Sequence, residues 1–178
     1  MDRFSILVGD ITQSDAEAIV NAADPSLLGG AGVDGAIHAA AGPELLAECR
    51  TLGGCERGQA KLTAGYRLRA KYVIHTPGPV WQGGDHGEAA LLASCYRSCL
   101  ETAAARGIRT LDFCSISTGV YGYPLPLAAT VALRTIMEFL AGRALPERVR
   151  MVCHSEAAAE VYRRTGNLWY AEDKDQRM

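Results

Sequence analysis

Residues 20–38 hold the glycines and the carboxylate best suited to binding an anion and doing chemistry beside it. The stretch reads VNAADPSLLGGAGVDGAIH, in which a strand-like apolar run is followed by a glycine-rich loop and a helix-like segment. Glycines let a ligand approach the main chain closely, and the first amides of a helix attract anions. The pattern therefore predicts a phosphate site at the amides before Val33 and Asp34.

Asp34 is an unusual residue for a simple phosphate site. A carboxylate in the first turn of a helix interacts well with the helix dipole, but it repels a bound anion unless it has a chemical role. We therefore interpret Asp34 as a candidate catalytic residue.

A second loop of small residues, STGVYGYP at 117–124, follows a later strand-like run. Ligands of open α/β sheets bind outside the carboxyl ends of the strands, so two such loops can clamp one ligand, and two phosphate-sized slots indicate a pyrophosphate. Neither loop matches the Walker pattern or the strict dinucleotide fingerprint. At a third strand end, Asp10 either accepts hydrogen bonds from an exocyclic amine or only caps the stretch after it.

Strand-like and helix-like segments alternate along the chain, which predicts an α/β fold with a sheet covered on both faces. The expected strands cover residues 4–8, 18–22, 59–63, 72–76, 110–115 and 148–153. The expected helices cover a short stretch at 14–17 and the longer segments 34–41, 43–52, 88–106, 126–140 and 156–164.

Length and composition predict one cytoplasmic domain. The 178 residues fit a domain at 1–168 and a polar C-terminal tail at 169–178, whose last residues we expect to be disordered. A net charge of −2 argues against a globally basic nucleic-acid binder. The six cysteines lack the spacing of a zinc site or of a secreted disulfide framework, and no secretory or membrane-spanning segment is evident, so we expect reduced thiols and no membrane partner.

Several ordered motifs resemble those of one known family. They are GDIT at 9–12, VNAAD and GGAGVDGAIH within 20–38, GQAKLTAGYRL at 58–68, YVIHTPGPVW at 72–81 and STGVYGYP at 117–124. Together they resemble the macrodomains, specifically the MacroD-type ADP-ribosyl hydrolases that include the bacterial YmdB proteins. The resemblance extends from about residue 4 to residue 165.

This resemblance implies a three-layer α/β/α sandwich with a mixed, mostly parallel sheet of about six strands, and an ADP-ribose cleft at the strand ends. Asp10 corresponds to the residue that recognises the adenine amino group, with Ile11 beside it and His154 near the adenine. Tyr121 corresponds to the aromatic residue near the distal ribose, and Asn21 lies at its strand end as in the family. The residues implied to wrap the pyrophosphate are Gly30, Ala31, Gly32, Val33, Ser117, Thr118, Gly119 and Val120.

The implied reaction is hydrolysis at the distal ribose. It removes mono-ADP-ribose from an acidic side chain or acetyl from O-acetyl-ADP-ribose, with Asp34 orienting or deprotonating water and without a metal or other cofactor. The implied partners are ADP-ribose, O-acetyl-ADP-ribose and mono-ADP-ribosylated protein. Because some bacterial relatives are linked with RNase III, a regulator of RNase III or of RNA metabolism is a further alternative. We expect a monomer.

Asp24 is the main departure from the family pattern, which has Asn at this position. An ionised Asp only accepts hydrogen bonds, and it adds a negative charge near Asp34 and the phosphates. Asp24 could bind ribose hydroxyls and preserve activity, share a proton with Asp34, or repel the ligand. We therefore count Asp24 with Asp34 among the catalytic candidates, and keep an ADP-ribose reader with weak or no turnover as the alternative.

Ala31 is a smaller departure from the family pattern. It replaces a glycine, so its backbone must avoid positive φ or be strained.

Overall fold

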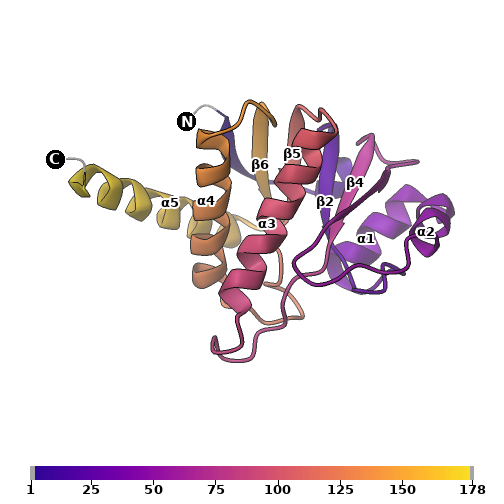
Figure 1. Ribbon diagram of the computed structural model, residues 1–178, viewed down its shortest axis with the longest axis horizontal. Coiled ribbons are helices and arrows are strands. Elements are labelled where there is room, and N and C mark those ends of the chain that lie inside the picture. The colour runs from indigo at the N-terminus through magenta and orange to yellow at the C-terminus, as the bar shows by residue number, and fades with distance from the viewer. Residues whose placement is uncertain (1–2, 177–178) are drawn as a thin grey trace.

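Six strands form one mixed sheet in the computed structural model, which describes residues 3–176 (Figure 1). The strand order is β1-β6-β5-β2-β4-β3. β3 runs antiparallel to β4, and the other neighbouring strands are parallel. The bounds are β1 (Phe4–Val8), β2 (Ala18–Ala22), β3 (Lys61–Ala64), β4 (Tyr72–Thr76), β5 (Thr110–Phe113) and β6 (Arg148–Cys153).

The inner strands are buried because helices flank the sheet. Four of the five residues of β2 and four of the five residues of β4 are buried, as expected for parallel strands covered on both faces. Figure 1 shows α3 and α4 crossing in front of the sheet, and α1 and α2 beside its β4 side. The bounds are η1 (Ile11–Gln13, a 3-10 helix), α1 (Gly32–Ala41), α2 (Pro43–Arg50), α3 (Glu88–Ala105), α4 (Leu125–Ala141) and α5 (Glu156–Gln176). The predicted α/β/α sandwich with a mostly parallel sheet is confirmed.

Two predicted helical boundaries are wrong. The short helix expected at 14–17 is instead η1 at Ile11–Gln13, because the Asp10 side chain accepts the N–H of Thr12 and starts the turn earlier. The last helix continues to Gln176 rather than ending at residue 164, so residues 172–176, which we expected to be disordered, are helical. One glycine, Gly166, costs only about 1 kcal/mol in a helix and does not stop it. Residues 177–178 lie outside the described part of the chain.

The parallel strands bring the chemical residues to one edge of the sheet. β1, β2, β5 and β6 point the same way, so the segments after Val8, Ala22, Phe113 and Cys153 meet at their carboxyl ends. Ligands of such sheets bind at this edge. Within residues 3–176, no helix has both the length and the apolar character needed to span a membrane.

Candidate active site

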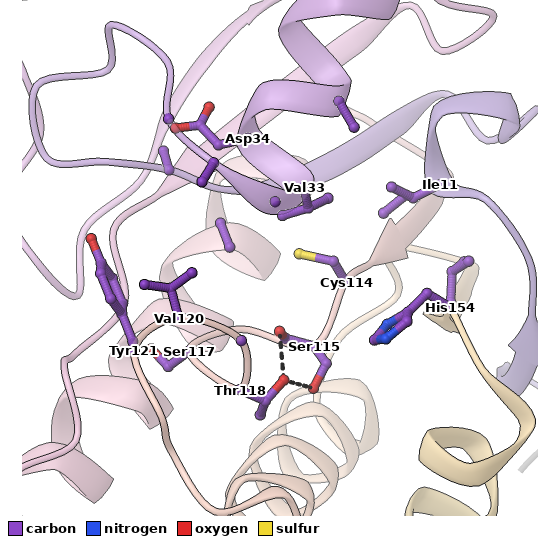
Figure 2. Close-up of a pocket in the computed structure, with 18 of the residues that line it drawn as sticks. Ile11, Val33, Asp34, Cys114, Ser115, Ser117, Thr118, Val120, Tyr121 and His154 are labelled. Carbon is purple, nitrogen blue, oxygen red and sulfur yellow. Dashed lines mark hydrogen bonds between the residues drawn. The ribbon is translucent and has the colours of Figure 1, made fainter.

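A cleft of about 830 Å³ lies at the carboxyl ends of the parallel strands (Figure 2). Every residue that the sequence analysis placed at the site lines it, with the exception of Asn21, which is fully buried behind it. Figure 2 shows Asp34 and Tyr121 toward one end and Ile11 and His154 toward the other. The lining residues are Gly9, Asp10, Ile11, Thr12, Ala22, Ala23, Asp24, Gly30, Ala31, Gly32, Val33, Asp34, Ala36, Cys114, Ser115, Ser117, Thr118, Gly119, Val120, Tyr121, Val152 and His154.

The first loop presents unpaired amides at the N-terminus of α1. Ala31 is the N-cap residue, and its side chain cannot cap the helix. Its φ of −88° avoids the left-handed region, so replacing the family glycine causes no backbone strain here. Among the described residues, no acceptor pairs with the amides of residues 30–33. The loop therefore offers free N–H donors and the positive end of a helix to an anion.

Two glycines let the first loop pack against α1. A Cβ on Gly35 would lie 2.6 Å from the carbonyl oxygen of Gly30, and a Cβ on Gly30 would lie 3.1 Å from Asp34 Oδ2. Any larger residue at 35 must push the loop away from the helix. These glycines therefore set the spacing between the loop amides and the Asp34 carboxylate.

The second loop is a tight turn whose tip is open to solvent. Ser117 has a φ of +66°, and Tyr123 N–H closes the turn by donating to Ser117 O over 3.0 Å. In the described chain, the amides of residues 118–121 have no acceptor either. Val120 at the tip is 87% exposed. Both loops thus border the same cleft with unpaired amides.

The Thr118 hydroxyl of the second loop is directed at the protein rather than left free. Thr118 Oγ1 donates to Ser115, lying 2.8 Å from its Oγ and 3.2 Å from its carbonyl oxygen (Figure 2). Ser115 Oγ in turn bonds to the hydroxyl of buried Tyr162 over 2.6 Å. Ser117 Oγ is buried and has no hydrogen-bond partner in the described residues. The backbone amides are therefore better placed than the Thr118 hydroxyl to bind phosphate.

Asp34 is fixed from two sides at the wall of the cleft. The residue is 3% exposed, and its carboxylate accepts Asn21 Nδ2–H at Oδ1 over 2.9 Å and Asp24 N–H at Oδ2 over 3.1 Å. His38 Nε2 lies 3.4 Å from Oδ1 but forms no hydrogen bond within the described chain. A buried carboxylate held in one orientation can accept a proton from a water molecule in the cleft.

A buried network behind Asp34 fixes the Asn21 amide. Thr63 Oγ1 donates to the Ala64 carbonyl oxygen, so it accepts His75 Nε2–H over 2.9 Å. His75 Nδ1 is then the acceptor for the second Asn21 Nδ2–H, over 3.1 Å. Burial, with a smaller contribution from His38, lowers the pKa of His75 to about 3, which keeps the imidazole neutral. Asn21 therefore presents its amide nitrogen, not its oxygen, to Asp34.

The opposite end of the cleft contains Asp10, Ile11 and His154. Asp10 Oδ1 accepts Thr12 N–H over 2.9 Å and Thr12 Oγ1–H over 2.7 Å, so Asp10 does cap η1. It also lines the cleft, and capping uses a single carboxylate oxygen. Ile11 is buried, whereas His154 is exposed. Among the side chains that the structure describes, no three His, Cys, Asp or Glu residues gather closely enough to hold a metal ion.

A sequence model of one family, described as Macro domain, matches residues 20–132 of this chain. The chain belongs to the macro domain family. The match includes both loops and Asp34, and the family resemblance inferred from the motifs is confirmed.

Relatives and solved structures match nearly the whole macrodomain. A macro domain-containing protein of Mesorhizobium japonicum is 56% identical over 92% of this chain and 93% of its own length. A Salmonella gallinarum protein named O-acetyl-ADP-ribose deacetylase is 54% identical over 91% of this chain and 93% of its own. The structure of a mutant Oceanobacillus iheyensis macrodomain with ADPR superposes with a TM-score of 0.90, at 42% identity over 93% and 92% of the two chains.

Asp24 has a defined place in this macrodomain. Its Oδ2 accepts Ser26 N–H over 3.0 Å and Ser26 Oγ–H over 2.5 Å. The hydrogen bond from the Ser26 hydroxyl lowers the pKa of the Asp24 carboxyl most, and the bond from the Ser26 N–H lowers it as well. Burial opposes this effect, and the charge of Arg57 adds to it. Asp24 is therefore ionised at neutral pH, and its side chain bonds to Ser26 while its backbone N–H bonds to Asp34.

Sequence reasoning missed several lining residues of the macrodomain cleft. Cys114 and Ser115 line it because β5 ends at Phe113, two residues before the predicted end of that strand. Thr12 also lines the cleft next to the predicted Ile11, and Val152 lines it two residues before the predicted His154. Their proximity to the ends of predicted strands was the signal that could have identified them.

Proposed function

We propose that this macrodomain binds ADP-ribose in the cleft and hydrolyses esters at its distal ribose. The substrates are O-acetyl-ADP-ribose and proteins that carry mono-ADP-ribose on acidic side chains. Asp34 orients and deprotonates water. One observation carries the proposal. Two loops whose amides have no acceptor border the same cleft, and the wall of this cleft holds the fixed carboxylate of Asp34.

The two loops support binding of the pyrophosphate. Free amides of residues 30–33 and 118–121 can donate to phosphate oxygens, and the N-terminus of α1 adds the favourable end of its dipole. This placement leaves Asp10 and His154 for the adenine end and Tyr121 for the distal ribose, as the family resemblance implies. The solved structure of a relative with ADPR and the relatives named O-acetyl-ADP-ribose deacetylase support the same ligand class.

Asp34 supports the hydrolytic step. Water adds to the ester bond as Asp34 accepts its proton, and the bond breaks to give ADP-ribose and a free carboxylic acid, acetic acid or the protein side chain. The pyrophosphate is held by fixed amides, so the ester is positioned next to Asp34 without reorganising the site. Six unpaired thiols support a cytoplasmic location. A monomeric state and an RNase III partner remain predictions from the resemblance.

The substrate assignment is tested with matched peptides. We expect the macrodomain to release ADP-ribose from a peptide modified on glutamate, and acetate from O-acetyl-ADP-ribose. A peptide that carries ADP-ribose on arginine is the control, because its N-glycosidic bond is not an ester. Release from the arginine adduct but from neither ester would contradict the proposal.

An ADP-ribose reader is the second candidate, and Asp24 is the observation that favours it. A second carboxylate in the cleft repels the phosphates and removes the hydrogen-bond donor that Asn would provide. We expect Asp24→Asn to change turnover of O-acetyl-ADP-ribose while ADP-ribose binding persists. Equal turnover by the natural chain and Asp24→Asn would show that the carboxylate has no influence on catalysis.

A further inference from the structure

The side chains that line the cleft are negatively charged on balance. Asp10, Asp24 and Asp34 line it, whereas the described lining residues include no lysine or arginine. The pyrophosphate of ADP-ribose brings two more negative charges. Unpaired amides and a helix N-terminus supply only partial positive charge. A cation near the cleft that offsets a carboxylate would therefore strengthen binding of this ligand.

Arg57 supplies a cation at the end of the cleft that contains Asp34 and Tyr121. Its guanidinium carbon lies 5.1 Å from the centre of the Tyr121 ring, a distance typical of a cation–π contact. Its Nη1 donates to the carbonyl oxygen of Gly78. A backbone hydrogen bond also holds Tyr121, because Trp81 N–H donates to the Tyr121 carbonyl oxygen over 2.9 Å. Arg57 thus links the segment before β3, the segment after β4 and the second loop.

Arg57 also acts electrostatically on Asp24. Hydrogen bonds from Ser26 are the main reason that the pKa of Asp24 is lowered, and the positive charge of Arg57 lowers it further. Asp24 belongs to the same end of the cleft, since its backbone N–H bonds to Asp34. The extra carboxylate and the arginine therefore act as opposite charges at the end of the cleft that contains the candidate base.

We propose that Arg57 is a positioning residue for the anionic substrate, because it holds Tyr121 over the distal end of the cleft and offsets the charge of Asp24. The substitution of Asp for the family Asn at residue 24 is then tolerated because the charge of Arg57 acts on it electrostatically. This inference rests on the proposed binding of ADP-ribose. It adds a residue outside the cleft lining to the set that determines affinity.

A cycle of charge-neutralising substitutions tests the proposal by calorimetric titration of ADP-ribose at low salt. We expect Arg57→Gln to weaken binding about fivefold, as for the loss of one unit charge several ångströms from an anion near the surface. Asp24→Asn should tighten binding by a similar factor, and the double variant should return to within about twofold of the natural chain. The effect of Arg57→Gln should shrink in 1 M salt because screening removes the Coulomb interaction.

Three controls separate charge from structural damage. Arg57→Lys retains the charge and should bind ADP-ribose nearly as the natural chain does. Arg134→Gln makes the same charge change on the exposed side of α4 and should leave affinity unchanged. Adenosine, which has no phosphate, should bind the natural chain and Arg57→Gln equally.

The outcomes distinguish this inference from the proposed function. If Arg57→Gln binds ADP-ribose as tightly as the natural chain, the role of Arg57 alone is overturned. The same holds if Arg57→Gln loses affinity and adding Asp24→Asn does not restore it. Equal weakening by Arg57→Lys and Arg57→Gln would also overturn it, because charge would not be the cause. Absence of any ADP-ribose binding by the natural chain would overturn the proposed function and this inference together.

Discussion

Asp34, Asn21 and His75 form a chain of hydrogen bonds in which each donor has a defined acceptor. The neutral His75 accepts one hydrogen of the Asn21 amide, which directs the other to Asp34. A buried polar group costs free energy unless it is hydrogen-bonded; both amide hydrogens of Asn21 are satisfied, whereas its Oδ1 has no partner among the described residues. The network therefore fixes the candidate base through a residue, His75, that does not line the cleft.

His75 gives stability a pH dependence whose sign follows from its lowered pKa. The folded chain keeps His75 neutral down to a pH of about 3, whereas the unfolded histidine binds a proton near pH 6.5. The unfolded state therefore binds more protons between these values, and this contribution to stability is lost as the pH falls from about 6.5 to 3. We expect His75→Phe to flatten the pH dependence of the free energy of urea unfolding over this range.

The same variant should be less stable at pH 8 by about 1–3 kcal/mol, because Asn21 and Thr63 each lose a buried partner. His86→Phe is the control, since His86 is exposed on the loop before α3. An unchanged pH slope in His75→Phe would mean that His75 titrates normally in the folded chain.

At the scale of elements, the cleft depends on how closely the first loop approaches α1. Gly30 and Gly35 permit this approach, and the N-terminal amides of α1 then lie beside the Asp34 carboxylate. The loop, the helix and strand β2, which carries Asn21, form one unit. A change in their spacing should affect ligand binding more than folding.

Gly35→Ala tests this spacing. The added methyl group would lie 2.6 Å from Gly30 O, so the loop must shift even though alanine favours the helix itself. We expect at least tenfold weaker ADP-ribose binding, while thermal unfolding changes by only a few degrees. Gly142→Ala is the matched control, because an added Cβ there meets no atom within 4 Å. Natural affinity in Gly35→Ala would show that the loop position is not critical.

At the scale of the whole molecule, the six cysteines are buried and free. Burial raises the pKa of Cys49 and Cys153 to about 11 and that of Cys114 to about 12, so little thiolate is available at neutral pH. We expect slow reaction with a disulfide reagent in the native state and rapid reaction of six thiols in urea. Because Cys114 lines the cleft, ADP-ribose should slow its native reaction further. Rapid native labelling would contradict this burial.

The sequence alone predicts most of this architecture, because its strands, helices and glycine loops have strong local patterns. The Gly30 and Ser117 loops were placed correctly at strand ends, and the strand order then brings them to one cleft. The Asn21–His75 bond could not be predicted in the same way. It depends on the register of β2 against β4, which are neighbours in the sheet although some fifty residues separate them in the sequence.

The residues at which the helices begin and end were also harder to predict than the presence of the helices. Asp10 starts η1 because its side chain accepts two hydrogen bonds from Thr12, and α5 continues through Gly166, so neither boundary follows from the hydrophobic pattern alone. The role of Arg57 was not apparent for a related reason. Its contacts with Tyr121 and Gly78 are made between segments that only the folded sheet brings together.

In the proposed function, Asp34 activates water for a substrate that the two loops hold. The most direct test is acetate release from O-acetyl-ADP-ribose by the natural chain, Asp34→Asn and Asp34→Ala, with ADP-ribose affinity measured on the same samples. We predict a loss of kcat of about 100-fold or more in both variants, the usual effect of removing a general base, with affinity within a few-fold of natural. Turnover by both variants at the natural rate would contradict the account.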